Sequence, residues 1–154
     1  MRRFTLGLAA LAAAASAPAI AGTTTGSMDV TLNVDNACSL TTAAIDFGTV
    51  TDFSAASTVN SLTTLKCTPN AVATVRVSLG NSVNGTQRRM TNGGGTQFID
   101  YNIQDSSNTA WPSAGLNFTG TGADVSLGIR GVVPVQAAKP AGTYSDVVTI
   151  DVTY

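Results

Sequence analysis

The two cysteines are the residues whose chemistry is easiest to interpret. Cys38 and Cys67 could form a disulfide, bind a metal ion or act as a redox pair. A metal site is disfavoured because the chain contains no histidine and a structural zinc site needs four ligands. A redox pair is disfavoured because the spacing is not C-x-x-C. We therefore expect a Cys38–Cys67 disulfide, which in the chain-entropy model stabilises a domain by about 3–4 kcal/mol.

Acid–base catalysis has few candidate residues. The chain has no histidine and no glutamate, which leaves nine scattered aspartates, Lys66, Lys139 and three tyrosines. A glycosidase or an aspartic protease needs two carboxylates held together, and the spacing of the aspartates singles out no pair. We expect no enzymatic activity, no cofactor and no metal ion.

Three further motifs each have a functional and a structural interpretation. The glycine-rich run at 92–95 could bind an anion, but no P-loop residues follow it, and a hairpin turn is favoured. Arg88 and Arg89 could bind an anionic ligand, but neighbours on a strand point to opposite faces, and solvated surface is favoured. Trp111 could stack on a sugar, but as the single tryptophan of a small domain it is favoured as a buried core residue.

The N-terminus has the pattern of a signal peptide over residues 1–21. Arg2 and Arg3 are followed by an apolar run from residue 4 to 15 and by small residues before Gly22. The run is shorter than the roughly 20 residues of a membrane-spanning helix, and no later segment approaches that length. We expect an exported protein that begins at Gly22 and has no stable membrane insertion.

The charge of the exported chain is slightly negative. Loss of Arg2 and Arg3 leaves six lysines and arginines against nine aspartates. Nucleic-acid-binding domains are usually strongly basic, so we expect no nucleic-acid partner.

Alternation with a period of two runs through most of the exported chain and indicates β-strands. Turn-forming runs such as Asn84-Gly85 separate the alternating segments. No segment after residue 22 has the spacing of a helix. The pattern favours an all-β fold, an antiparallel sandwich of short strands. The alternating segments are 26–34, 71–79, 99–103, 125–133 and 144–154.

The two ends of the chain look complementary. The apolar face of the first segment consists of Gly26, Met28, Val30, Leu32 and Val34. The last segment offers Tyr144, Val148, Ile150, Val152 and Tyr154, and we expect no strand after it to pair with. A free strand edge is a template for another chain, and a head-to-tail contact of this kind builds filaments. The alternative is that residues 26–34 form the first strand of their own domain.

A series of short motifs follows in order along the exported chain. The motifs are the alternating segment 26–34, Cys38, Ile45-Asp46-Phe47-Gly48, Cys67-Thr68-Pro69, Arg89-Met90, Tyr101-Asn102-Ile103, Trp111, and the stretch from Gly142 to Tyr154. In this order and spacing the sequence resembles archaic chaperone–usher pilin subunits of the spore coat protein U type over essentially the whole exported chain. The resemblance implies an immunoglobulin-like sandwich that lacks its last strand, formed by residues 38–154, with residues 22–37 as a donor-strand extension.

The resemblance also implies a function and partners. A periplasmic chaperone would lend a strand to the subunit, and an outer-membrane usher would let the extension of the next identical or related subunit replace it. Residues 26–34 would be the donor strand and residues 144–154 the edge of the acceptor groove. The fibre would reach the cell surface and serve adhesion and biofilm formation. A secreted coat protein, or a single-domain carbohydrate-binding or adhesin module, is the alternative.

Overall fold

The computed structural model describes residues 20–154 and divides the chain into two units after Asn33. The predicted signal peptide lies outside the described residues except for Ile20 and Ala21. The described part of the first unit, residues 20–33, contains no strand. Within residues 20–154 there is no helix, and hence none that could cross a membrane.

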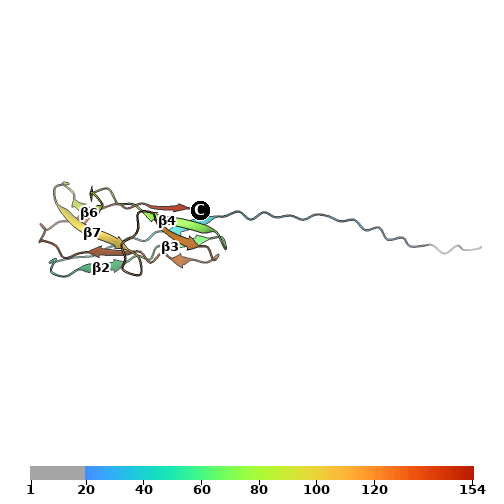
Figure 1. The fold of residues 1–154 in the computed structure, drawn as a ribbon, viewed down its shortest axis with the longest axis horizontal. Helices are drawn as coiled ribbons and strands as arrows, with labels where there is room; N and C mark the ends of the chain where they lie inside the picture. The colour runs from blue at the N-terminus through green and yellow to red at the C-terminus, as the bar shows by residue number, and fades with distance from the viewer. Residues whose placement is uncertain (1–19) are drawn as a thin grey trace, which may run out of the picture. The chain divides into compact units, whose positions relative to one another are not determined.

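The second unit, residues 34–154, is built from short antiparallel strands (Figure 1). Their side chains alternate between buried and exposed, as the period-two pattern predicts; in β7 every second residue from Ile99 to Ile103 is buried. The strands are β1 (Cys38–Thr41), β2 (Ser57–Asn60), β3 (Thr64–Cys67), β4 (Val72–Val77), β5 (Val83–Asn84), β6 (Gln87–Asn92), β7 (Phe98–Gln104), β8 (Leu116–Thr119), β9 (Val125–Ser126), β10 (Arg130–Val133), β11 (Tyr144–Ser145) and β12 (Ile150–Thr153).

The strands form three sheets, and their order leaves β1 and β12 at sheet edges. One sheet has the order β1-β3-β9, the second β11-β6-β7-β10-β2 with β5 beside β6, and the third β12-β4-β8. The hairpin between β6 and β7 turns through the glycine run at 93–95, as predicted. The Asn84-Gly85 turn joins β5 to β6, also as predicted.

Two segments that the sequence presents as continuous strands are each divided between two sheets. The stretch 125–133 breaks at Gly128, whose φ is +63°, so that β9 pairs with β3 while β10 pairs with β7 and β2. The stretch 144–154 divides in the same way, because β11 pairs with β6 and β12 pairs with β4. Alternation continues across both breaks because the same face stays turned toward the core.

The core lies between the sheets and draws on all three. Leu65 of β3, Val75 of β4 and Ile103 of β7 are each at most 3% exposed. Trp111 is 5% exposed and donates its indole N–H to the carbonyl of Val75 at 3.4 Å. The interpretation of Trp111 as a core residue is therefore confirmed.

Candidate functional site

The described domain contains a groove of about 530 Å³. One wall is the stretch 42–47, which follows β1, and the other is the stretch 144–150, which joins β11 to β12. The floor consists of core side chains from several strands: Val77, Met90, Tyr101, Ile103 and Ile129. The groove is therefore a long apolar trough that opens into the core of the sandwich.

Each wall of the groove adjoins a strand with an unpaired edge: the stretch 42–47 follows β1, and the stretch 144–150 leads into β12. β1 pairs only with β3, and β12 pairs only with β4, in the described residues. A strand edge without a neighbour leaves backbone N–H and C=O groups available to another strand. The groove thus combines apolar side chains at its base with hydrogen-bonding groups along its sides.

The predicted edge residues divide into those that line the groove and those that lie beyond it. Tyr144, Val148 and Ile150 line it. Val152 packs against the core cluster outside the groove, and Tyr154 is 58% exposed. The alternation of half-buried and exposed residues runs from Tyr144 to Val152, and the chain leaves the groove wall after Ile150.

The opposite wall was not identified as a wall from the sequence. Ala43, Ile45 and Phe47 are half-buried, whereas the residues between them are exposed. This short period-two pattern is the signal in the sequence that could have identified the wall, and only Ile45 and Phe47 belong to the family motif. Gly131 of β10 makes room for this wall, because a Cβ there would lie 2.6 Å from Ile45 Cγ2 and 2.8 Å from Phe47 Cζ.

The predicted donor residues lie mostly in the first unit and are solvent-exposed. Met28 is 85% exposed, Val30 and Leu32 are each 89% exposed, and Val34 is 72% exposed. Gly26 carries no side chain and has open space around it. Scattered exposed apolar residues are ordinary, but four at a regular spacing of two form one apolar face. Residues 26–33 form no strand in the part of the chain that the structure describes.

A carboxylate lies among the apolar groove residues. Asp146 accepts a hydrogen bond from the hydroxyl of Tyr101 at 2.6 Å and another from the backbone N–H of Asn81 at 2.8 Å. Burial and the hydrogen bond to Asp146 raise the pKa of Tyr101 above its ordinary value. Gly80, with a φ of +86°, lets the carboxylate approach, because a Cβ there would collide with Asp146. Asp146 therefore fastens the groove wall to the loop that follows β4.

The expectation that Arg88 is solvated surface is wrong. Arg88 is only 8% exposed, and its guanidinium donates to the carbonyls of Ser78 at 3.0 Å and Val77 at 3.1 Å. These carbonyls lie where β4 ends, so the side chain supplies hydrogen bonds that a ladder no longer provides. Burial lowers the pKa of Arg88, while Tyr101 and Asp146 act in the opposite direction. Arg89 lies on the other face and stacks over the Phe98 ring at 4.1 Å.

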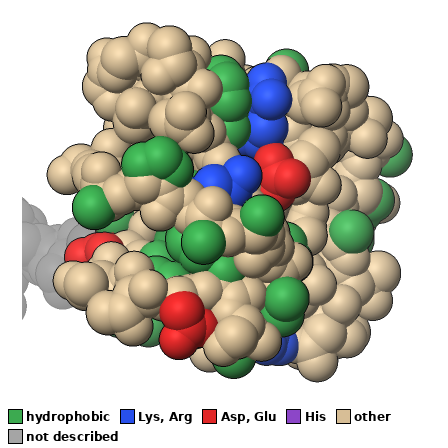
Figure 2. Space-filling view, turned by 90° about the vertical axis from the view of Figure 1, so that its left-hand side faces the viewer, with side chains coloured by type: hydrophobic (Ala, Val, Ile, Leu, Met, Phe, Trp, Pro, Cys, Tyr) green, Lys and Arg blue, Asp and Glu red, His purple; other side chains and the backbone are tan. Residues whose placement is uncertain are grey.

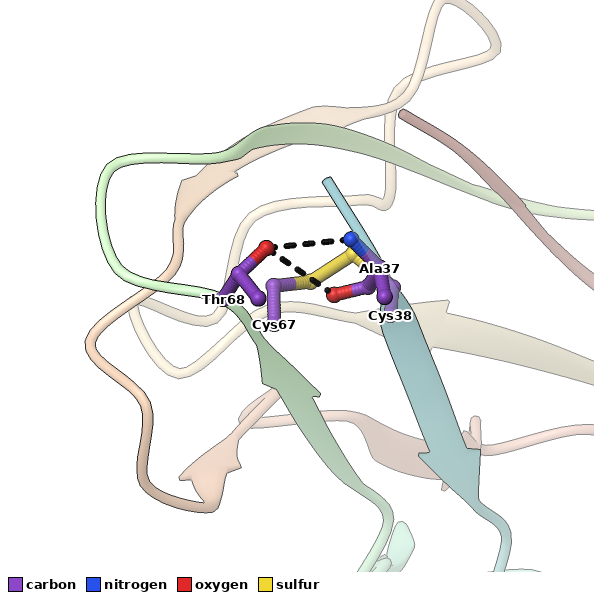
Figure 3. The surroundings of a disulfide bond; sticks show 4 residues. All are labelled: Ala37, Cys38, Cys67 and Thr68. Carbon is purple, nitrogen blue, oxygen red and sulfur yellow. Dashed lines mark hydrogen bonds between the residues drawn. A yellow bond between two sulfur atoms is a disulfide. The ribbon is translucent and has the colours of Figure 1, made fainter. Parts of the chain in front are cut away.

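The expected disulfide is present where the extension meets the domain (Figure 3). Cys38 of β1 and Cys67 of β3 are directly opposite each other in the ladder. Beside them, Thr68 donates its backbone N–H to the carbonyl of Ala37 at 2.9 Å. The Thr68 hydroxyl accepts the backbone N–H of Ala37 at 3.0 Å. The disulfide and Thr68 together fix the residue at which the extension leaves the domain.

The charged side chains do not gather by sign on the face that Figure 2 shows. On that face the Lys and Arg side chains lie close to Asp side chains, and the hydrophobic ones are scattered among polar atoms. A nucleic-acid-binding surface is usually a continuous basic stripe. The face that Figure 2 shows carries no such stripe.

Comparison with protein families gives one match that covers most of the chain. The family model described as Spore Coat Protein U domain matches residues 24–151. Protein U of Myxococcus xanthus is 30% identical over an alignment of 172 residues, which covers 96% of this chain and 96% of that protein. The family match includes the groove, both cysteines and the whole of the exposed apolar face before them.

Comparison with solved structures gives a match to a pilus subunit complex. It is the crystal structure of the CsuC–CsuE chaperone–tip adhesion subunit pre-assembly complex from the archaic chaperone-usher Csu pili of Acinetobacter baumannii. The TM-score is 0.57 and the identity 26%, over 79% of this chain and 40% of that one, so this chain spans less than half of its length. The likeness agrees with the immunoglobulin-like antiparallel sandwich that the sequence predicted.

Proposed function

The chain belongs to the Spore Coat Protein U domain family, and on that premise we propose that it is a structural pilin subunit of a surface fibre. Subunits join by donor-strand exchange, in which the extension of one subunit occupies the groove of the next. The groove between two unpaired strand edges is the observation that carries the proposal. A strand laid into it completes the sandwich and covers the apolar floor, the recognition mode known as β-strand addition.

The exposed face of the extension has the chemistry that the groove requires. Burial of Met28, Val30, Leu32 and Val34 at about 1.5–3 kcal/mol each yields roughly 6–12 kcal/mol before the costs of ordering and association. Ladder hydrogen bonds to the two walls add to this gain. Gly26 occupies a position where no side-chain pocket is needed.

The arrangement of donor and acceptor on one chain produces an open polymer. Each subunit gives its extension to one neighbour and receives the extension of another, so the contact is heterologous and does not close. Residues 22–37 are the donor-strand extension, residues 38–154 are the pilin domain, and residues 1–21 are removed on export. The fibre lies on the cell surface, where it serves adhesion and biofilm formation.

The proposed partners follow from the open groove. An exposed apolar trough with free strand edges is prone to aggregation, so the subunit needs a protein that covers the groove before assembly. The similar solved structure is a chaperone–subunit complex, which supports a periplasmic chaperone as that partner. An outer-membrane usher then exchanges the chaperone for the extension of the next subunit.

The test compares two neighbouring positions on opposite faces of the extension. Leu32→Asp puts a charge on the apolar face, whereas Thr31→Asp puts the same charge on the polar face. We expect the wild type and Thr31→Asp to give ladders on an unboiled gel and Leu32→Asp to remain monomeric. Normal ladders from Leu32→Asp would contradict the donor role of this segment.

A secreted coat protein is the second candidate, favoured by the similarity to Protein U over 96% of both chains and by the family's description. It would use the same strand exchange and differ in where the polymer is deposited. Electron microscopy of cells labelled with an antibody against the domain distinguishes the two. Filaments that shear from the cell support a pilus, and a continuous layer that resists shearing supports a coat.

A further inference from the structure

Two buried hydroxyls hold one wall of the groove. Ser61 is 5% exposed and Thr63 is 1% exposed, and both lie in the connection between β2 and β3. The Ser61 hydroxyl donates to the carbonyl of Ala43 at 3.0 Å, and the backbone N–H of Ala43 donates to the Thr63 hydroxyl at 3.1 Å. Both backbone groups of Ala43 are therefore bound by side chains instead of by a neighbouring strand.

The hydrogens of this cluster can be assigned without a conflict. The single Ser61 hydroxyl hydrogen goes to Ala43, so the 2.7 Å contact between the two hydroxyls is a bond from Thr63 to Ser61. The backbone N–H of Thr63 also donates to the Ser61 hydroxyl, at 3.2 Å. Both hydroxyls therefore donate and accept a hydrogen bond, which suits a buried cluster that keeps one fixed arrangement.

The bonds to Ala43 determine which way the neighbouring backbone groups point. In an extended chain the N–H and C=O of one residue share an edge, and those of the next residue face the opposite edge. Ala43 faces the body of the domain, so Thr42 and Ala44 face the groove. The same alternation holds at the other end of β1. The carbonyl of Ala37 is bonded to Thr68, so Ala37 faces β3 as Ala43 faces the domain. The Cα distance of 4.1 Å between Cys38 and Cys67 is that of a non-hydrogen-bonded pair, so the backbone groups of Cys38 face the free edge.

Hydrogen bonds to β4 likewise determine which backbone groups of the facing wall, residues 148–152, point toward the groove. The backbone N–H of Ser78 donates to the carbonyl of Thr149 at 2.9 Å, and the N–H of Thr149 donates to the Ser78 hydroxyl at 2.8 Å. Thr149 is therefore turned toward β4. By alternation, Val148, Ile150 and Val152 present their backbone groups to the free edge.

We propose that Ser61 and Thr63 are positioning residues for the incoming strand: by binding Ala43 they aim the backbone groups of Thr42 and Ala44 into the groove. The occupant, the extension of a second copy of this chain, then forms a ladder on both sides. This inference rests on the proposed function. The ladder between β1 and β3 ends at Thr41. Beyond it, the two hydroxyls supply to Ala43 the hydrogen bonds that a neighbouring strand would otherwise supply, so the free edge of β1 continues to Ala44.

The first test needs no substitution. Amide hydrogen exchange is measured residue by residue by quenched-exchange NMR on the full exported chain, before and after assembly. We expect at least tenfold slower exchange after assembly at Thr42, Ala44, Val148 and Ile150. The amides of Ala43 and Thr149 should be slow in both states, since they are already bonded.

The possible outcomes separate the two proposals. Slower exchange at Val148 and Ile150 without any change at Thr42 and Ala44 would overturn the positioning role and leave donor-strand exchange in place. No change on either wall, together with no ladders on an unboiled gel, would overturn both.

The second test removes one hydroxyl and retains the shape. Thr63→Val cannot accept from Ala43, whereas Thr63→Ser keeps the hydroxyl. Thr74→Val is the matched control, because its hydroxyl bonds Asn117 between β4 and β8, away from the groove. We expect oligomers of Thr63→Val to dissociate about tenfold faster, the effect of roughly one net hydrogen bond. Thr63→Ser should match the wild type, and equal effects of Thr63→Val and Thr74→Val would overturn the proposal.

Discussion

Residues 26–34 and residues 144–154 carry the same period-two pattern and have different structures. In the extension, Val30 and Leu32 are each 89% exposed, and residues 26–33 form no strand. At the other end, β11 pairs with β6 and β12 pairs with β4. Alternation determines which side chains share a face, but a strand forms only where an edge with free N–H and C=O groups is available to it. The extension has the pattern of a strand that needs a partner.

The largest test of this comparison removes the covalent link of the domain. Replacing both Cys38 and Cys67 with alanine should lower the free energy of unfolding by about 3–4 kcal/mol, because the unfolded chain regains loop entropy. Urea unfolding monitored by Trp111 fluorescence measures the loss. The rate at which a broad-specificity protease cleaves the extension near Leu32 should not change. An unchanged midpoint of urea unfolding would contradict the prediction.

A matched pair of truncations sharpens the difference between the two regions. Ile103→Ala removes a side chain that is 2% exposed and should cost about 3 kcal/mol of folding free energy through lost burial and a cavity. Leu32→Ala should change it by less than about 0.5 kcal/mol, since the side chain is exposed. Chemical denaturation of the monomer measures both. In the assembly assay we expect Leu32→Ala to weaken the ladders. A large loss of monomer stability from Leu32→Ala would contradict the view that the extension does not pack on its own domain.

Gly131→Ala tests the groove wall itself. The added Cβ would press on Ile45 and Phe47, so we expect a cost of about 1–3 kcal/mol and a displaced wall. Gly93→Ala in the β6–β7 turn is the control, because a Cβ there meets nothing within 4 Å. The measurement is the unfolding midpoint together with the yield of oligomers. Equal behaviour of the two variants would show that the wall tolerates the displacement.

The smallest effect is a dependence on alkaline pH. The pKa of Tyr101 is raised in the folded state, so above about pH 10 the unfolded chain loses this proton more readily than the folded one does. The contribution of Tyr101 to stability is present below that pH and is lost as the pH rises. Tyr101→Phe should flatten the fall in unfolding free energy between about pH 10 and 11, measured by urea titration at each pH. An unchanged slope would argue against the Tyr101–Asp146 bond.

Much of the fold follows from local patterns. The strands around Val75 and Ile103, the two glycine turns, the disulfide and the core position of Trp111 were all predicted, because each depends on periodicity or on a single residue type. The division of 125–133 and 144–154 between sheets was not predicted. A strand that changes sheets keeps its buried face, so alternation carries no sign of the change.

The candidate site was only partly predictable for a related reason. Tyr144, Val148 and Ile150 were expected at the groove and line it. The wall at 42–47 was not expected to face them, because it has no ladder and is held by two hydroxyls far along the chain. Burial of Arg88 was missed because it depends on the position at which β4 ends, a boundary that sequence patterns place poorly.

The attachment of the extension at Ala37 has a mechanical consequence. When residues 22–37 of one subunit lie in the next, a pull on the fibre enters the domain at Cys38. Without a cross-link the hydrogen bonds between β1 and β3 would carry that force. The disulfide passes the tension directly from Cys38 to β3 and so relieves the ladder, while Thr68 restrains Ala37 just ahead of it.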